Sequence, residues 1–478
     1  MSELTKESLS HLAALIRARK VSPVEVLEAH LNRIDQLNPM LNAIVTLAPD
    51  ALENARQAEA AIMRGETKGA LHGVPITIKD TIETKGLLTT SGSRVRANYV
   101  PIEDAPAVAR LRHAGAIILG KTNVAEMAAA YDTENPVFGH TNNPYDLRRT
   151  SGGSSGGEAA AIAACMSPGG LGSDLMGSIR VPAHFCGIVG LKPTTGRVPC
   201  AGHIPDSTGP AAVGAVIGPM ARIVEDVALL FSVIAGLENS ESVSRPMSDV
   251  LTRMDLRGCR VAWHSFDGVS PVTDETRHAV ESAASALANA GLEVREENPP
   301  AIEHGQDLWS ALFAHATLLQ MRREYAGQEH KAGALVRYLL DSSLTVEPPS
   351  NDDYSRARIE RDQLRATLVH WMKATPLIIA PVGAATAFEH GVRRVDIGGE
   401  AVSIFRSFSY SQTFNVFDLP SVCVTVGQSR EGLPIGVQII GRPYMEDSVL
   451  VAAQIVEESF GGWRQPLLAL PTEGDNPL

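Results

Sequence analysis

Serines set among glycines form the most chemically suggestive stretch of this chain. Between residues 150 and 182, glycine and serine crowd both sides of an alanine-rich run, Glu158 to Met166. A chain accepts the entropic cost of glycine where its backbone turns sharply or comes close to a substrate. Loops rich in backbone also offer free N–H groups that can stabilise an oxyanion. Apolar residues interleave with the glycines, which disfavours a solvated linker. We therefore expect a thin helix in the middle and a serine presented from a loop on each side.

Two familiar motifs occur nearby, and neither fits its mechanism. Residues 115–122 match the phosphate-binding pattern GxxxxGK[ST], but the middle residues, Ala116 to Leu119, read as a buried strand and leave no loop to hold a phosphate. Residues 152–156 match the G-x-S-x-G elbow of α/β-hydrolases, which must follow a strand. Residues 143–149 do not read as a strand. An α/β-hydrolase-type esterase is therefore kept only as an alternative.

A stronger pattern joins one lysine to a serine from each half of the stretch: Lys79, Ser154 and Ser178. With its surroundings, this pattern resembles the amidase signature family, and within it the bacterial aryl-acylamide and carbamate (urethane) amidases. The motifs that carry the resemblance are Gly73–Asp80, Gly120–Asn123, Gly152–Gly157, Gly172–Asp174, Gly177–Ala183, Phe185–Thr194, Gly218–Arg222, Asn415 with Leu419–Ser421, and Gly432–Gln438.

The resemblance implies a Ser-cisSer-Lys triad. Ser178 would be the nucleophile, Lys79 the base, and Ser154, which follows a cis peptide bond in the family, the bridge between them. A serine is a poor nucleophile until a base removes its proton, and a lysine serves as that base only when burial or neighbouring donors lower its pKa. We therefore expect activity to rise toward alkaline pH. A rate that titrates in the histidine range would argue against lysine.

The resemblance also implies roles for the residues around the triad. It places the oxyanion hole on the backbone N–H groups of Leu175, Met176, Gly177 and Ser178. Ser155, Asp174 and Arg180 would brace that loop through hydrogen bonds and an ion pair. The family commonly has glycine or alanine at position 176, so Met176 should narrow or line the acyl pocket, which Tyr131 and Phe138 are expected to share. Neither a cofactor nor a metal is implied.

The expected substrates are small or aryl amides and carbamates, with esters as a further class. One branch of the family, the glutamyl-tRNA amidotransferase A subunit, produces ammonia from glutamine. Residues 195–205 lack the usual continuation of that branch, which disfavours an amidotransferase subunit. We keep that branch only as an alternative. Some amidase-like proteins have lost the triad and act without catalysis. The presence of all three triad residues disfavours that possibility.

The elements around these residues alternate between helix and strand, which predicts an α/β fold with a central mixed sheet covered by helices on both faces. In the strand that ends at Lys79, alternation puts Ile76 and Ile78 on one face and Thr77 and Lys79 on the other. Judged from this segment alone, Lys79 would be a solvated lysine at a strand end. The resemblance to the amidase signature family instead requires it to be buried.

Four segments are expected along the chain. Residues 1–65 should be helical, 66–240 should form the amidase signature core, and 375–478 should complete that core. Residues 241–374 should form an α/β and helical insert whose helical part, 306–374, caps the substrate side.

Composition limits the remaining classes of function. A net charge of −12 without a basic cluster argues against nucleic-acid binding. The most apolar run, 227–237, is too short to cross a membrane. The N-terminus lacks the features of a secretory signal, and five scattered cysteines suggest neither disulfides nor a zinc site. We expect a cytoplasmic monomer or homodimer that acts on a small molecule.

Overall fold

A single mixed sheet of eleven strands organises the chain. The computed structural model describes residues 3–236, 254–342 and 349–468. In spatial order the strands are β1 (Ile44–Leu47), β3 (Ile117–Thr122), β2 (Pro75–Lys79), β8 (Gly169–Asp174), β10 (Val216–Ala221), β9 (Val189–Lys192), β16 (Ser421–Gln428), β17 (Pro434–Gly441), β13 (Leu377–Pro381), β11 (Arg260–Trp263) and β12 (Glu293–Glu296). The expected α/β architecture with a mixed sheet is confirmed.

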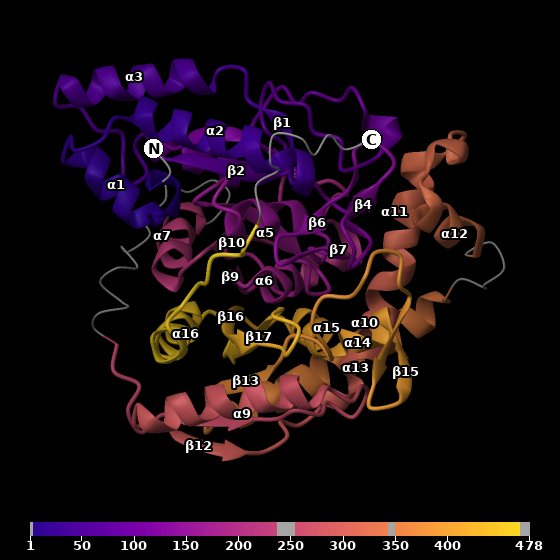
Figure 1. The fold of residues 1–478 in the computed structure, drawn as a ribbon. Helices are drawn as coiled ribbons and strands as arrows, with labels where there is room; N and C mark the ends of the chain where they lie inside the picture. The colour runs from indigo at the N-terminus through magenta and orange to yellow at the C-terminus, as the bar shows by residue number, and fades with distance from the viewer. Residues whose placement is uncertain (1–2, 237–253, 343–348, 469–478) are drawn as a thin grey trace.

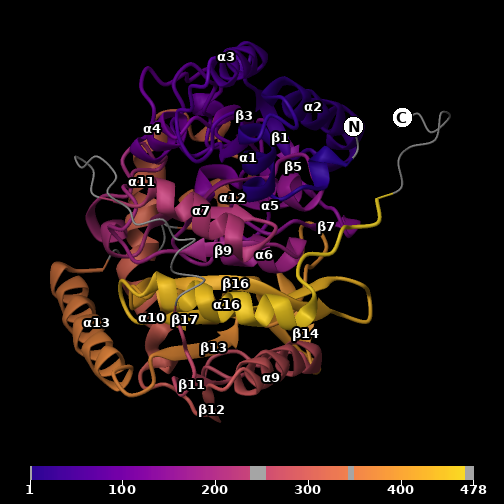
Figure 2. The same ribbon diagram turned by 90° about the vertical axis from the view of Figure 1, so that its left-hand side faces the viewer.

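Helices cover both faces of this sheet, and each face has its own hydrophobic core. One core is shared by α1 (Leu9–Arg17), α2 (Pro23–Leu41), α3 (Ala51–Met63), α4 (Pro106–His113), α7 (Val224–Ile234), α9 (Asp274–Asn289) and α16 (Glu446–Phe460). Figure 2 shows α7, α9 and α16 lying in front of the strands. The other core takes side chains from α5 (Gly156–Ala163), α6 (Arg180–Cys186), α10 (Gly305–Trp309), α13 (Asn351–Trp371) and α15 (Ser409–Val416).

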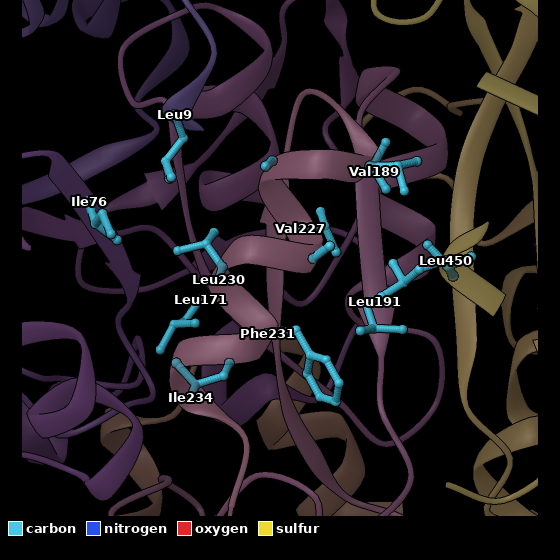
Figure 3. Packing of buried hydrophobic residues seen from close by; sticks show 14 of the residues in the cluster. Leu9, Ile76, Leu171, Val189, Leu191, Val227, Leu230, Phe231, Ile234 and Leu450 are labelled. Atoms are coloured by element: carbon cyan, nitrogen blue, oxygen red, sulfur yellow. The ribbon is translucent and has the colours of Figure 1, made fainter. Parts of the chain in front are cut away.

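The packing of α7 shows how the first core forms. This helix carries acidic residues only in its first turn and is apolar through most of its length, which suits a helix laid flat on a sheet. Its residues Leu230 and Phe231 pack among Leu171 and Leu191 of the strands beneath (Figure 3). The helix thereby holds β8 and β9 in place from one side, and the opposite face of β8 is left for the site.

The remaining elements lie beside these layers. Helices α11 (His315–Tyr325) and α12 (Ala334–Ser342) stand next to the N-terminal half of the molecule (Figure 1). Helix α14 spans Ile404–Ser407. Three two-stranded ribbons pair β4 (Glu134–Asn135) with β5 (Gly139–His140), β6 (Asn142–Asn143) with β7 (Asp146–Thr150), and β14 (Arg394–Ile397) with β15 (Glu400–Ser403).

Two local expectations from the sequence are wrong. Residues 146–150 form strand β7, although 143–149 did not read as a strand, because this strand pairs mainly within a small ribbon, with a single bridge to Glu389, and carries no apolar alternation. Residues 169–174, expected to lie in a loop, form the interior strand β8. Its glycines give no β signal, but its neighbours β2 and β10 supply the hydrogen bonds.

The alternation predicted for β2 is confirmed. Ile76 and Ile78 belong to the core that α7 shares, whereas Thr77 hydrogen-bonds Glu158 of α5 and Lys79 is fully buried on that same side. The solvated lysine that the segment alone suggested is therefore wrong. Helix α5 fills the face where solvent would otherwise lie.

Of the expected insert 241–374, the parts that the structure describes go to three places, one of which is the second hydrophobic core, where α13 packs. Strands β11 and β12 extend the sheet beyond β13, and α9 covers them. Residues from 309 to 339 instead border a cavity beside β8. The sheet thus runs without a break across the segment boundaries at 240 and 374.

Gly170 permits the close approach of α5 to β8, so we expect Gly170→Ala to be costly. A Cβ at this position would lie 2.1 Å from Glu158 Oε1 and 2.2 Å from the carbonyl oxygen of Thr77. The overlap should lower the free energy of unfolding by about 1–3 kcal/mol, as measured by urea denaturation. Gly427→Ala in β16 is the matched control, because a Cβ there has nothing within 4 Å. Equal stability of the two variants would contradict this packing.

Candidate active site

Lys79 ends strand β2 and lies fully buried against serine hydroxyls. Its Nζ is 2.7 Å from Ser154 Oγ and 2.9 Å from Ser173 Oγ. Burial lowers the pKa of Lys79 to about 7, against the opposing attraction of Asp174 and Glu158. At neutral pH, Lys79 is therefore an uncharged amine in a substantial fraction of the protein molecules.

Ser154 and Ser155 form the turn that starts α5. The Gly153–Ser154 peptide bond is cis, and Ser154 is fully buried with its Oγ at Lys79. Ser155 links the two halves of the glycine-serine stretch. Its N–H donates to the carbonyl oxygen of Ser178 at 3.3 Å, and its hydroxyl donates to the carbonyl oxygen of Ser173 at 3.3 Å. These bonds fix the Ser154 turn against the loop that carries Ser178.

That loop runs from Leu175 to Ile179 and is tied down by the Asp174 carboxylate. Asp174 accepts hydrogen bonds from the N–H of Gly177 at 2.7 Å and of Ile179 at 3.1 Å, and it forms a fully buried ion pair with Arg180 at 3.0 Å. Burial alone would raise the pKa of Asp174, but the Arg180 charge holds it well below its ordinary value. The carboxylate therefore remains ionised and keeps the loop in place.

Two polar residues from the C-terminal part of the chain complete this brace. Arg180 also donates to Gln438 Oε1 at 2.8 Å and to Asn415 Oδ1 at 2.6 Å, and Asn415 donates to Asp174 at 2.9 Å. Sequence reasoning placed both residues in family motifs and gave neither a role. Their contacts with the loop appear only once β17 and α15 pack beside it.

The four expected oxyanion donors are not equivalent. The Gly177 N–H is already bonded to Asp174, whereas no acceptor is found among the described residues for the N–H groups of Leu175, Met176 and Ser178. The carbonyl oxygen of Leu175 accepts from Trp309 Nε1 at 2.8 Å. Because the peptide unit is planar, this contact also fixes the direction of the Met176 N–H.

A cavity of about 820 Å³ opens over this loop. Ser154, Ser173, Ser178 and His203 line it at the polar end. The rest of the wall is largely apolar and includes Met176, Trp309, Leu318, Met321, Leu335, Tyr338, Phe388 and Phe405. Arg393 and Arg394 are exposed residues on the same wall.

Of the expected pocket residues, Met176 and Tyr131 line this cavity and Phe138 does not. Tyr131 also donates its hydroxyl to the carbonyl oxygen of Met176 at 2.7 Å, so it supports the loop as well as the wall. Phe138 follows the β4 strand and borders a separate surface hollow with Asn42 and His140. The expectation that Phe138 joins the pocket is not met, because the β4–β5 ribbon turns this residue toward α2.

Lys121, the lysine of the phosphate-binding pattern, has a structural role. Its Nζ is buried and donates to the carbonyl oxygen of Ile82, to Thr84 Oγ1 at 3.0 Å and to Thr89 Oγ1 at 3.1 Å. It thus ties down the segment that follows Lys79. In the described residues, no group of three or more histidine, cysteine or acidic side chains could hold a metal ion. No helix of that part of the chain is long and apolar enough to cross a membrane.

Sequence reasoning missed three polar residues at the site. Glu158 lies under β2 and β3, where it accepts from Thr77 and Thr122, and burial raises its pKa to about 7. Ser173 lies within one of the family motifs but was given no function. His203 lies 30 residues beyond Ser173, in a stretch noted in the sequence only for its resemblance to bacterial amidases, and only the fold shows its contact with Ser173.

Comparison with known proteins identifies the family of this chain. A model of the amidase family matches residues 25–450. The chain belongs to the amidase family. Its members hydrolyse C–N bonds, so this chain is an amidohydrolase of that family.

Its relatives include several kinds of amidase. The A subunit of a glutamyl-tRNA(Gln) amidotransferase from a Sulfurihydrogenibium species is 33% identical over 94% of this chain and 96% of that protein. Human fatty-acid amide hydrolase 2 is 30% identical over 95% of this chain and 89% of that protein. The solved structure of a bacterial aryl acylamidase superposes with a TM-score of 0.85 at 27% identity, covering 95% of this chain and 96% of that one.

The low pKa of Lys79 predicts how the reactivity of this amidase depends on pH. A lysine that acts as a base must be unprotonated, so the rate of labelling by a fluorophosphonate should rise as pH passes through about 7 and level off above it. The labelling rate between pH 5.5 and 9.5 measures this midpoint. A midpoint near 10 would show that Lys79 is solvated when the protein works.

This prediction corrects an expectation from the sequence. A midpoint in the histidine range no longer argues against lysine, because burial brings the pKa of Lys79 into that range. Lys79→Ala is the deciding control, since it should abolish the labelling that titrates near pH 7.

Proposed function

We propose that this amidase hydrolyses amides with bulky apolar acyl or aryl groups through a serine acyl-enzyme. In this mechanism Ser178 is the nucleophile, Ser154 relays protons and Lys79 is the base. One observation carries the proposal: a fully buried lysine, with its pKa lowered to about 7, contacts serine hydroxyls at the polar end of an apolar cavity.

The first chemical step forms the acyl-enzyme. Uncharged Lys79 takes the proton of Ser154, and Ser154 takes that of Ser178, while Ser178 Oγ attacks the carbonyl carbon. The tetrahedral oxyanion then collapses and the C–N bond breaks. Ser154 gives its proton to the departing nitrogen, which leaves as a neutral amine, and takes back the proton held by Lys79, so that Lys79 is uncharged again. In the second step a water molecule gives its proton to the same relay and attacks the ester, which releases the acid and restores Ser178.

The backbone of the 175–178 loop would stabilise the oxyanion. The N–H groups of Leu175, Met176 and Ser178 are the candidate donors, because the Gly177 N–H is bonded to Asp174. Rigid donors of this kind contribute because they need not reorganise during the reaction. The buried Asp174–Arg180 pair and the contacts of Trp309 and Tyr131 supply that rigidity.

The cavity wall supports a substrate with a large apolar group. Met176, Trp309 and Phe405 stand near the serines on that wall, with further apolar residues from α11 and α12. A relative named fatty-acid amide hydrolase and a structural neighbour named aryl acylamidase both act on amides with apolar parts, as their names state. A carbamate presents the same carbonyl with an alkoxy arm, so we include carbamates, and esters, in the proposed range.

A glutaminase reaction is the second candidate. Relatives at 33% identity are glutamyl-tRNA(Gln) amidotransferase A subunits, and such a role would require partner subunits. Free glutamine carries an ammonium and a carboxylate, which need charged partners in the pocket. Arg393, Arg394 and Asp206 also line the cavity, but the side chains named near Ser178 on its wall, Met176, Trp309 and Phe405, are apolar, which favours the first candidate.

Covalent labelling tests the assignment of the nucleophile. We expect a fluorophosphonate probe to attach to Ser178, which peptide mass spectrometry would locate, and we expect Ser178→Ala to lose both labelling and turnover. Ser207→Ala is the matched control, because Ser207 lines the same cavity outside the triad and its variant should still be labelled. Labelling that survives in Ser178→Ala would rule out the proposed nucleophile.

A series of p-nitroanilides tests the proposed substrate class. Each added methylene that the cavity buries contributes about 0.8 kcal/mol, so kcat/KM should rise roughly fourfold per methylene from the acetyl to the hexanoyl anilide. Phenyl carbamates and glutamine complete the screen. Flat dependence on chain length, together with ammonia release from glutamine, would replace this candidate with the glutaminase.

A further inference from the structure

A histidine reaches the candidate base through a serine. The Ser173 hydroxyl lies between Lys79 Nζ, at 2.9 Å, and His203 Nε2, at 2.8 Å. All three side chains are buried, and both Ser173 and His203 line the cavity. The chemical steps proposed above use neither residue.

The surroundings of His203 determine which of its nitrogens carries the proton. Its Nδ1 lies 2.8 Å from the carbonyl oxygen of Pro205. A carbonyl can only accept, so Nδ1 holds the proton and Nε2 of the neutral ring is an acceptor. Burial lowers the pKa of His203 to about 4, and the nearby Lys79 charge adds to this effect. The ring is therefore neutral at physiological pH, and Ser173 donates its hydroxyl proton to Nε2.

The direction of the hydrogen bond from Ser173 to His203 determines how Ser173 can bond Lys79. With its proton turned toward His203, Ser173 Oγ can only accept from the amine of Lys79. An uncharged lysine has two N–H bonds and one lone pair. When one N–H is given to Ser173, the lone pair is free to face Ser154 Oγ at 2.7 Å, where the proton must be taken. If the Ser173 proton were free to rotate, it could bond to that lone pair and block the base.

We propose that His203 is a positioning residue that holds Ser173 as a hydrogen-bond acceptor and so keeps the lone pair of Lys79 for Ser154. This inference rests on the proposed function, because it matters only if Lys79 is the base. His203 does not touch the substrate carbonyl in this mechanism. It acts through Ser173.

Two carboxylates act on Lys79, but the oxygens of both are bonded to residues other than Ser173. Asp174 of β8 acts on Lys79 electrostatically, but its oxygens are bonded to Arg180, Asn415 and the loop. Glu158 of α5 also acts on Lys79, and its oxygens are bonded to Thr77 and Thr122, with Lys121 of β3 nearby. His203 is the group that the structure places against the hydroxyl of Ser173.

The test compares His203→Leu with the wild-type protein by the rate of fluorophosphonate labelling at Ser178 across the pH range. We expect the plateau rate to fall about tenfold to a hundredfold, because the lone pair is now blocked. The midpoint should move roughly one pH unit lower, because a hydroxyl that donates to the amine favours its uncharged form. A variant that only loosened the site would admit water and move the midpoint upward, toward the ordinary pKa of lysine. An upward shift or an unchanged profile would overturn the proposal.

Two further variants sharpen the comparison. His203→Gln keeps an acceptor oxygen for Ser173 and should restore most of the plateau rate and the midpoint; a glutamine variant that behaves like the leucine variant contradicts the acceptor role. His30→Leu removes another buried histidine, one in α2, and should leave the labelling profile unchanged.

A second substitution, at Ser173, distinguishes a positioning role of His203 from a packing role by the labelling rate of the double variant. If the misdirected hydroxyl blocks Lys79 in His203→Leu, then Ser173→Ala in the same protein removes the block, and the double variant should label faster than His203→Leu alone. If His203 merely packs, the second substitution should slow labelling further, and the proposal is overturned. Absence of labelling at Ser178 in the wild-type protein would instead refute the proposed function itself.

Discussion

The burial of one lysine amine is the constraint on which this site depends. An ammonium group is costly to bury without a charged partner, and Lys79 is surrounded mainly by serine hydroxyls and carbonyl oxygens. Its proton is therefore held loosely, which lowers its pKa to about 7. Asp174 and Glu158 lie close enough to act on Lys79, but their oxygens are bonded elsewhere. A carboxylate paired directly with Lys79 would restore its charge and remove the base.

The rest of the site shields that amine from solvent and fixes the loop that carries Ser178. Helix α5 packs against β2 and β8 at a distance that only a glycine at position 170 allows, and this closes the face of the sheet over Lys79. The Asp174–Arg180 pair then fixes the loop that presents Ser178. Gln438 and Asn415 join that pair from β17 and α15, so the C-terminal part of the chain helps to hold the loop. A buried ion pair adds little net stability, but it fixes a geometry.

In the proposed mechanism, chemistry and specificity come largely from different parts of the fold. The lysine, the serines and the loop lie on β2, β8 and the start of α5, within the sheet and its closest helix. The apolar wall comes largely from α10, α11, α12 and the 388–405 segment, which lie at the side of the molecule (Figure 1). Trp309 belongs to both parts, because it lines the wall and also bonds the carbonyl oxygen of Leu175. This division is consistent with relatives that share the fold while their names state different amide substrates.

The sequence alone determined the family, the α/β architecture and the face of β2 on which Lys79 lies, because these depend on local motifs and on a strand's period of two. It also selected Lys79, Ser154 and Ser178, which the fold brings to one site. It could not assign the strand β8, because glycines carry no β propensity and the hydrogen bonds come from neighbouring strands. It misplaced Phe138, because the turn of a two-stranded ribbon decided where that side chain points. Only the tertiary structure set the contacts of Gln438, Asn415 and His203, since each reaches the site across long chain separations. Contacts between such distant residues produce no characteristic residue spacing in the sequence, because packing rather than chain order brings the residues together.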